Sequence, residues 1–390
     1  MHNVIKWLKR LLLSSVILIN LGAIAWLLLC MYAAYYDVAS KASIVSLFSF
    51  STPFAILLNV FFIFYWVFGK RRFIALGSII PILLCLKTLV LPTFGINLFR
   101  NNKLNTDDIE LKVLSWNVHL FDLGEWTLDK TTKSQIIKFI QEEDPDILCL
   151  VEYYKDSGSY EPYDEVIRQQ GYPYHYFQID ETKKKRFLNI SAGKDEKIEI
   201  GSIIFSKYPI VEKSIFPLDN TNYYRMLNAV IQLDNAQKIS VSLVHLQSFK
   251  FNEHDVNYVE EVKNKALDSL KVTDKSKQIV KKITHSSQRR AIQANVIDSF
   301  VKLNPYPIIL CGDFNDLPGS YVYTKSRGSL SDIFVDKGIG LGRTYRRIFR
   351  TLRIDYLFYD ASFFEPMGYA SPNIKLSDHY PIIGTFKIKK

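Results

Sequence analysis

Three long stretches with almost no charge lie in the first hundred residues, and this feature most limits how the chain can fold. Residues 11–36 and 42–69 contain no Asp, Glu, Lys or Arg, and residues 73–99 contain only Lys87. Each stretch exceeds the roughly 20 apolar residues that cross a bilayer as a helix. Core helices of a soluble domain are the alternative, but three successive uncharged runs of this length are improbable there. The sequence therefore predicts three transmembrane helices near 11–36, 43–68 and 73–98.

Basic residues flank these stretches unevenly. Lys6, Lys9 and Arg10 precede the first stretch and a Lys-Arg-Arg turn at 70–72 follows the second, whereas residues 37–42 hold one lysine. Because positively charged loops stay in the cytoplasm, the N-terminus is predicted inside and everything after residue 100 outside. The chain is thus predicted to be a multi-pass protein of the cytoplasmic membrane. Residues 1–104 would form its anchor, and residues 105–390 would face the periplasm or exterior.

Most of the charged residues lie after the predicted anchor. The formal net charge of +10 favours anionic partners such as phosphoesters, nucleic acid or acidic lipid surfaces, and it does not choose among them. The four cysteines are too few for a disulfide framework and have no spacing typical of a zinc site. We predict that all four are small buried residues.

Short β-branched and aromatic runs alternate with helical stretches from about Asn105 onward. Strands are predicted at 111–117, 147–152, 201–205, 229–233, 239–245, 308–312, 354–358 and 382–388. Helices are predicted at 130–142, 160–170, within a long polar stretch near 254–283, and at 286–303. This alternation favours an α/β domain in which two sheets pack face to face with helices outside.

Several predicted strands end on a polar residue that a strand does not otherwise need. One such ending usually caps a strand, but six of them are difficult to explain in that way. The endings are Asn117 in LSWNVH, Glu152 in LCLVEYY, His245 in SLVHLQS, Asp313 and Asn315 in ILCGDFND, Asp355 in RIDYLFYD, and Asp378 with His379 in LSDHYPI.

This order of polar strand ends resembles the endonuclease/exonuclease/phosphatase family, the superfamily of deoxyribonuclease I, exonuclease III and the neutral sphingomyelinases. The resemblance spans about residues 108–390 and none of the predicted anchor. GDFN followed much later by SDHYP is specific as a pair, whereas WN or VE alone is weak. The resemblance implies a four-layered α/β sandwich, two face-to-face β-sheets flanked by helices.

Hydrolysis of a phosphoester needs a hard cation, a base for the attacking water, and donors for the phosphoryl oxygens. Mg²⁺ is usually held by one or two carboxylates and further oxygens, and Mn²⁺ takes similar ligands. The resemblance makes Glu152 a metal ligand, with Asn117 supplying a neutral oxygen beside it and Asp378 a second carboxylate. A carboxylate satisfied by nearby backbone donors is the structural alternative for Glu152.

Asp313 and Asn315 alternate with Phe314, so in an extended segment their side chains point the same way. The resemblance implies that Asp313 orients or deprotonates the water and that Asn315 donates to the phosphoryl oxygens. A tight Asx turn is the structural alternative. The resemblance also makes His379 a phosphate-facing base or donor, and Asp355 the residue that orients it.

Two further side chains join this set. His245 ends its own strand, and the sequence does not decide whether His245 or His379 is the base. Arg225 in NYYRMLNAVIQL resembles an arginine that family members aim at the scissile phosphate, although a solvated Arg is equally compatible with its position. Polar insertions at 182–198 and 250–288 have no counterpart that we place.

These patterns predict a membrane-anchored, divalent-metal-dependent phosphoester hydrolase, a phosphodiesterase or phosphatase. Its partners would be the lipid bilayer and a phosphoester substrate, namely a lipid headgroup, nucleic acid or small phosphoester, with no obligate protein partner inferred. A nuclease of the same family acting outside the cytoplasm is one alternative. A binding protein built on an inactive hydrolase scaffold is another, and its expected sign is the loss of catalytic positions that this sequence retains.

Overall fold

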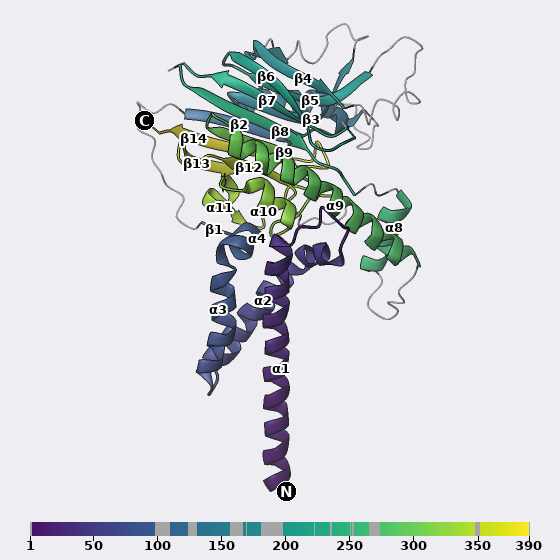
Figure 1. Cartoon of the computed structure of the whole chain (residues 1–390), viewed down its shortest axis with the longest axis vertical. Coiled ribbons are helices and arrows are strands. Elements are labelled where there is room, and N and C mark those ends of the chain that lie inside the picture. The colour runs from purple at the N-terminus through teal and green to yellow at the C-terminus, as the bar shows by residue number, and fades with distance from the viewer. Residues whose placement is uncertain are drawn as a thin grey trace.

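Apolar helices form the base of the molecule, and two stacked sheets with outer helices form its head (Figure 1). The structure is a computed structural model of the whole chain. It describes all residues except 1, 98–109, 124–130, 157–166, 169, 181–197, 222, 235, 250, 252, 265–273, 348–351 and 390.

Two helices are long and apolar enough to cross a membrane, α1 (His2–Tyr35) and α2 (Phe48–Val67), the latter preceded by a 3-10 turn, η1 (Ile44–Leu47). The third predicted span, 73–98, is wrong as one continuous helix. It consists of two helical pieces, Arg72–Leu84 and Leu86–Thr93, that are bent by 60°. At the break, residues 85–90 form a wide turn in which Val90 N–H bonds to Cys85 O. Such π-type turns commonly kink helices. The described residues therefore contain two membrane-length helices, or three if the bent pair is one span.

The bent third segment comprises η2 (Arg72–Ala75), α3 (Leu76–Leu84), η3 (Leu86–Val90) and α4 (Leu91–Thr93). Buried polar side chains join its first half to the other two helices. Asn20 of α1 donates to Ser78 Oγ of α3 at 2.7 Å and accepts from Trp66 Nε1 of α2 at 2.8 Å. Asn59 of α2 donates to Ala23 O of α1 at 2.8 Å. Such interhelical hydrogen bonds help to hold helices together in lipid.

Each of the two large sheets has six strands. The first has the order β13-β14-β2-β3-β5-β4, with bounds Phe364–Ala370, Ile382–Ile388, Glu110–Asn117, Ile147–Asp156, Ile198–Ser206 and Tyr174–Ile179. The second has the order β10-β12-β9-β8-β7-β6, with bounds Ser331–Asp332, Asp355–Tyr359, Ile308–Asp313, Lys238–His245, Arg225–Gln232 and Ile210–Pro217.

Apolar side chains of both sheets meet in one buried layer, to which Val113, Val151, Val241 and Ile309 belong. Helix α5 (Thr132–Glu143) packs on the outer face of the first sheet. The outer face of the second sheet is covered by α9 and α10, as Figure 1 shows. Helices α8, α9, α10 and α11 span Glu253–Asn264, Asp274–Leu303, Tyr321–Arg327 and Ile333–Lys337. The predicted sandwich of two sheets with flanking helices is confirmed.

All eight predicted strands are present, but three longer strands were missed: β4, β6 and β13. Two helix predictions need correction. Helix α9 begins at Asp274, so residues 286–303 are only its second part, and the stretch predicted near 254–283 is divided between α8 and α9. Most of the helix predicted at 160–170, the insertion at 182–198 and the boundary at residues 104 and 105 lie outside the described residues.

One parallel strand pair in each sheet brings the polar strand ends together. Strand β2 runs parallel to β3 in the first sheet, and β8 runs parallel to β9 in the second. The carboxyl ends of parallel neighbours lie at the same edge, where ligands commonly bind in α/β folds. Asn117, His245 and Asp313 end their strands at these edges. The predicted strand end at Glu152 is wrong, because Glu152 lies at a positive-φ bulge (φ 53°) inside β3, directly after Val151, the partner of Asn117.

Candidate active site

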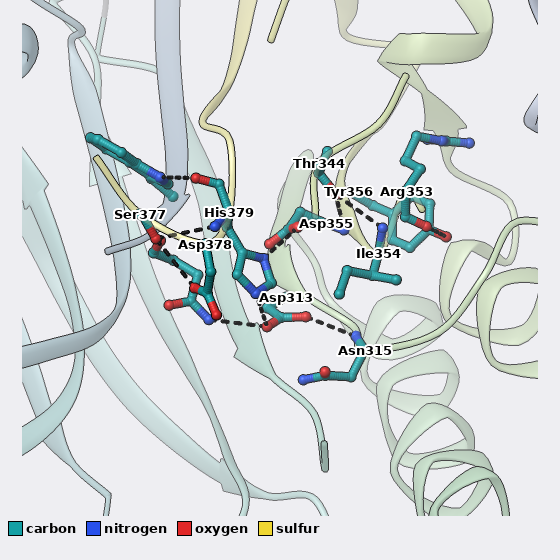
Figure 2. Close-up of polar contacts among 12 residues, drawn as sticks. Asp313, Asn315, Thr344, Arg353, Ile354, Asp355, Tyr356, Ser377, Asp378 and His379 are labelled. Carbon is teal, nitrogen blue, oxygen red and sulfur yellow. Dashed lines mark hydrogen bonds and ion pairs between the residues drawn. The ribbon is translucent and has the colours of Figure 1, made fainter. Parts of the chain in front are cut away.

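Asp313 is the centre of the cluster and is 1% exposed. Asn117 Nδ2 donates to Asp313 Oδ2 at 3.1 Å. The same oxygen lies 3.7 Å from His379 Nε2 and 3.8 Å from His245 Nε2. The structure thus places side chains from both sheets around one buried carboxylate, and Figure 2 shows Asp313 between His379 and Asn315.

A second carboxylate orients His379. Nδ1 of His379 lies 2.8 Å from Asp355 Oδ2, on the opposite side of the ring from Asp313 (Figure 2). Asp355 is itself fixed, because its N–H donates to the buried Thr344 Oγ1 at 3.1 Å. The ring of Tyr345 packs edge-on against the imidazole with centroids 4.9 Å apart. With Nδ1 held by Asp355, the Nε2 atom of His379 is directed at Asp313.

Burial and charge act in opposite directions on these groups. Burial lowers the pKa of His379, but Asp355 and Asp313 outweigh it and raise that pKa to about 10. Burial and the charge of Asp355 raise the pKa of Asp313 to about 6. Near neutral pH, His379 is therefore a charged donor, and Asp313 is an ionised carboxylate of increased basicity.

Two positive-φ residues determine the backbone path at the end of β9 and in the turn that follows it. Gly312 has φ 129°, and a Cβ there would lie 2.0 Å from Val244 O, so only glycine fits beside β8. Asn315 has φ 52°, its N–H donates to Asp313 Oδ1 at 2.9 Å, and its Nδ2 donates to Leu246 O at 3.0 Å. The extended segment assumed from the sequence is therefore wrong beyond Asp313, since the chain turns in an Asx turn. One amide proton of Asn315 remains for a substrate oxygen.

Two other carboxylates converge beside this centre. His119 Nδ1 lies 3.3 Å from Asp378 Oδ1 and 3.6 Å from Glu152 Oε2, while Glu152 Oε1 is 3.7 Å from His245 Nε2. Burial lowers the pKa of His119, but its hydrogen bond to the Glu152 carboxylate and the charge of Asp378 raise that pKa overall. The side-chain oxygen of Asn117, Oδ1, accepts from the backbone N–H of His119 at 3.0 Å and keeps a second lone pair. Two charged and one neutral oxygen fit the ligand preference of Mg²⁺.

A different trio lies closest together. Among the described residues, ligand atoms of Asp313, Asp355 and His379 all lie within 4.8 Å of one another. We interpret this trio as a hydrogen-bonded acid-base group, because the His379 nitrogen nearest Asp355 is already engaged at hydrogen-bond distance. The carboxylates of Glu152 and Asp378 are more accessible, with side chains 17% and 10% exposed.

Comparison with known proteins identifies the family. The sequence model of the Endonuclease/Exonuclease/phosphatase family matches residues 114–379, more than half of the chain. The chain belongs to this family. A second sequence model, of a domain of unknown function, matches residues 9–90. No curated protein matches the chain.

Solved structures share the fold of the family domain. The catalytic domain of human nocturnin is 16% identical, with a TM-score of 0.51, over 72% of this chain and 96% of that chain. A family protein from Bacteroides thetaiotaomicron is 16% identical, with a TM-score of 0.50, over 73% of this chain and 100% of that chain. At such identities the likeness supports the fold alone.

Arg225 is placed near the site only by strand register. It is the first residue of β7, and Leu227 of that strand pairs with Leu243 of β8 in antiparallel register. Continuing the register sets Arg225 opposite His245 on the same face. Its role toward the phosphate stays a prediction.

Three residues of this cluster were not predicted from the sequence. His119 follows Asn117 by two positions in LSWNVH and enters the site through a turn, His119–Asp122, in which all four residues have positive φ. Ser377 donates to Asn117 O at 2.7 Å, and Tyr345 packs on His379. A histidine two residues after a strand-end Asn was a visible signal, whereas Tyr345 had none.

Proposed function

We propose that the chain is a membrane-anchored, divalent-metal-dependent phosphoester hydrolase in which water attacks phosphorus. One observation supports this most strongly. A buried carboxylate, Asp313, lies between an Asp-oriented imidazole and a more open pair of carboxylates, Glu152 and Asp378. Family membership supports the same reaction class, since its members are generally hydrolases of phosphoesters.

The cation would be held by the carboxylates of Glu152 and Asp378 and by the side-chain oxygen of Asn117. A bound Mg²⁺ or Mn²⁺ would neutralise charge on the phosphoryl oxygens and polarise them. The two carboxylates supply the hard, negatively charged oxygens that such ions require. His119 lies between these carboxylates, so a cation held by both of them would displace its imidazole or lie beside it.

Asp313 is the base that orients the water and accepts its proton. Its raised pKa of about 6 brings it close to the range in which a carboxylate is an effective base near neutral pH. His379, protonated and oriented by Asp355, donates from Nε2 to a phosphoryl or leaving oxygen. Asn315 donates its remaining amide proton, and Arg225 adds positive charge. His245 lies near both Glu152 and Asp313 and stays the second candidate for proton transfer.

A nuclease is the second candidate function. Family membership supports it, and such enzymes need only phosphate contacts and groove shape. Net charge does not support it, since residues 105–390 hold 39 Lys and Arg against 38 Asp and Glu, a net charge of +1. An inactive binding protein is less well supported. Each polar strand end that hydrolysis needs is retained, and the described ones cluster at a single site.

The test uses the full-length protein in detergent with bis(4-nitrophenyl) phosphate and 4-nitrophenyl phosphate as model substrates. Turnover is expected to disappear with EDTA and to return with Mg²⁺ or Mn²⁺. Asp313→Asn keeps the size of the side chain but removes its basicity, and should lower kcat by about 10²- to 10⁴-fold. The matched control is Asp234→Asn, an exposed carboxylate between β7 and β8, which should change nothing. Chelator-resistant turnover, or full activity in Asp313→Asn, would refute the proposal.

A further inference from the structure

The catalytic domain is docked directly on the apolar helices. Arg353, only 2% exposed, donates from Nη2 to Pro92 O of α4 at 2.8 Å and binds Asp332 through Nη1 at 2.7 Å. Just after α4, the strand β1 (Gly95–Ile96) pairs with β11 (Ile339–Gly340) of the domain. The contact is fixed, because this buried arginine pairs its charge with Asp332 and donates an N–H to Pro92 O.

A second contact region lies at the ends of the other two helices. Asn295 Nδ2 of α9 donates to Asp37 Oδ2 at 3.3 Å, and Gln288 Nε2 donates to Ala39 O at 3.2 Å. A Cβ added at Gly319 would lie 3.8 Å from Thr52 of α2 and 2.7 Å from Leu89 of η3 in the third segment. Two separate contact regions resist tilting of the domain. Figure 1 shows the head seated on the ends of all three helical segments, so the height of the site above a membrane is set by the fold.

The membrane boundary can be located along α1. The hydrocarbon core is about 30 Å thick, which is about 20 helical residues at 1.5 Å each. Counted from Arg10, the core ends near residue 30. Tyr32, Tyr35 and Tyr36 follow with exposed fractions of 54%, 57% and 37%. Tyrosines gather at the membrane interface, so this last turn of α1 marks the boundary on the side of the catalytic domain.

The catalytic centre lies close to that boundary. Ala33 of α1 and Ser49 of α2 line a small cavity together with Asp316. Asp316 follows Asp313 by three residues, which even in a fully extended chain span at most about 11 Å. The headgroup layer is itself roughly 5–8 Å thick on each side of the core. The backbone of Asp313 therefore lies within about 11 Å of a residue that lines this cavity with the ends of α1 and α2.

Aromatic rings line the segment between the site and the membrane. Phe249 and Phe251 follow His245, are half-buried, and stack with ring centroids 5.5 Å apart. Phe249 also packs on Phe50 in the first turn of α2, at 6.1 Å. The side chains of Glu152 and His245 are 17% and 15% exposed, whereas that of Asp313 is 2% exposed. The rim formed by these two phenylalanines after His245 is thus aromatic and in contact with the first turn of α2.

We propose that the substrate is the phosphorylated headgroup of a lipid in the same bilayer, in the leaflet on the catalytic side. This inference rests on the proposed function and adds its substrate class. In the reaction one water forms a new P–O bond, the P–O bond to the leaving alcohol breaks, and the alcohol oxygen takes up a proton. The aromatic rim would support the acyl chains or glycerol part of the lipid while the headgroup enters beside Glu152 and His245.

The test compares lipid in the same membrane with lipid in another. Full-length protein is reconstituted in vesicles of phosphatidylethanolamine and phosphatidylglycerol that contain labelled phosphatidic acid and sphingomyelin. In a parallel sample these labelled lipids are placed only in protein-free vesicles. Released water-soluble label is measured with Mg²⁺, and bis(4-nitrophenyl) phosphate, plasmid DNA and RNA are assayed in the same preparation. At least one of the two labelled lipids should be cleaved about 10-fold faster or more in the protein's own membrane, because anchoring raises its effective concentration.

A pair of surface variants tests the rim. Phe251→Ser should lower turnover of membrane lipid about threefold or more, because apolar contact with the lipid is lost, and should leave bis(4-nitrophenyl) phosphate turnover unchanged. Tyr174→Ser is the matched control. Tyr174 is 39% exposed on β4, an edge strand of the other sheet, and its replacement should affect neither substrate.

The outcomes separate the two proposals. If bis(4-nitrophenyl) phosphate is hydrolysed but no lipid is, or if lipid in separate vesicles is cleaved as fast as lipid in the protein's own membrane, the lipid inference is overturned and the hydrolase stands. Cleavage of DNA or RNA in place of lipid would likewise overturn it. Loss of all hydrolysis, including that of the model diester, would refute the proposed function itself.

Discussion

Asp355 and His379 make the closest contact between ionisable side chains in the site, 2.8 Å. Their contributions should therefore overlap. Asp355→Asn removes the charge that orients the imidazole, and His379→Ala removes the donor, so each should lower kcat by about 10²-fold or more. The double variant should be little worse than His379→Ala, because residues that act as a unit are not additive. If the loss in kcat of the double variant equals the product of the two single losses, with folding verified by circular dichroism, the two residues act independently.

Glu152 provides the test of the cation site. Replacing it by Gln exchanges a charged oxygen for a neutral one, and the Kd for Mn²⁺ should rise about 10-fold or more. Titration calorimetry or electron paramagnetic resonance of the full-length protein in detergent measures this without reference to turnover. Glu110→Gln, at the exposed start of β2 and the opposite end of the sheet, is the control. Equal Mn²⁺ affinities in both variants would place the ion elsewhere.

At the residue scale, the sequence predicted side chains at strand ends better than those in turns. Glu152, His245 and Asp313 were predictable because each follows an apolar run that must be a buried strand. His119 was not, because its position depends on a turn of four positive-φ residues that no residue type there announces. The Asx turn at Asn315 was considered as an alternative, and the φ of 52° at that residue supports it.

At the scale of elements, the close pairing of β8 and β9 requires glycine at position 312 of the GDFN motif. Gly312→Ala would place a Cβ 2.0 Å from Val244 O at a φ of 129°. The unfolding free energy should fall by about 2 kcal/mol or more, as overpacked and strained positions do. Gly368→Ala is the control, since its added Cβ would meet Thr385 at an ordinary 3.8 Å. Thermal unfolding in detergent compares them, and equal midpoints would contradict the close packing of β8 and β9.

Elements in the interior of each sheet were predictable and those at the edges were not. The three longer strands that were missed, β4, β6 and β13, all lie at sheet edges. Strand β6 alternates mostly exposed and half-buried residues, so it lacks the continuous apolar run that marks a central strand. The bend of the third apolar segment was equally hidden, because hydropathy reports length in residues and not the direction of the helix axis.

At the scale of the whole molecule, the sidedness of the chain remains a prediction. The Lys-Arg-Arg turn at 70–72 should stay in the cytoplasm and the C-terminus should lie outside. Reporter fusions at residues 71 and 390 should therefore give opposite signals. The same signal from both would reverse one of the two ends and rule out three crossings.

Composition separated an apolar anchor from a charged domain but gave no sign that the two are docked. That contact depends on single side chains, Arg353 against Pro92 O and Asn295 against Asp37, which have no periodic signature. Under the proposed membrane anchoring, this docking would fix where the site lies relative to the bilayer. The family fold was predictable because its chemistry imposes a fixed order of polar strand ends along the chain.

The most direct test of the account is hydrolysis of bis(4-nitrophenyl) phosphate by the full-length protein in H₂¹⁸O with Mg²⁺. If water attacks phosphorus at the site around Asp313, one ¹⁸O atom should appear in the 4-nitrophenyl phosphate product and none in 4-nitrophenol. The Asp313→Asn variant should give almost no product. Label in the phenol, or labelled phosphate formed equally fast by Asp313→Asn, would contradict it.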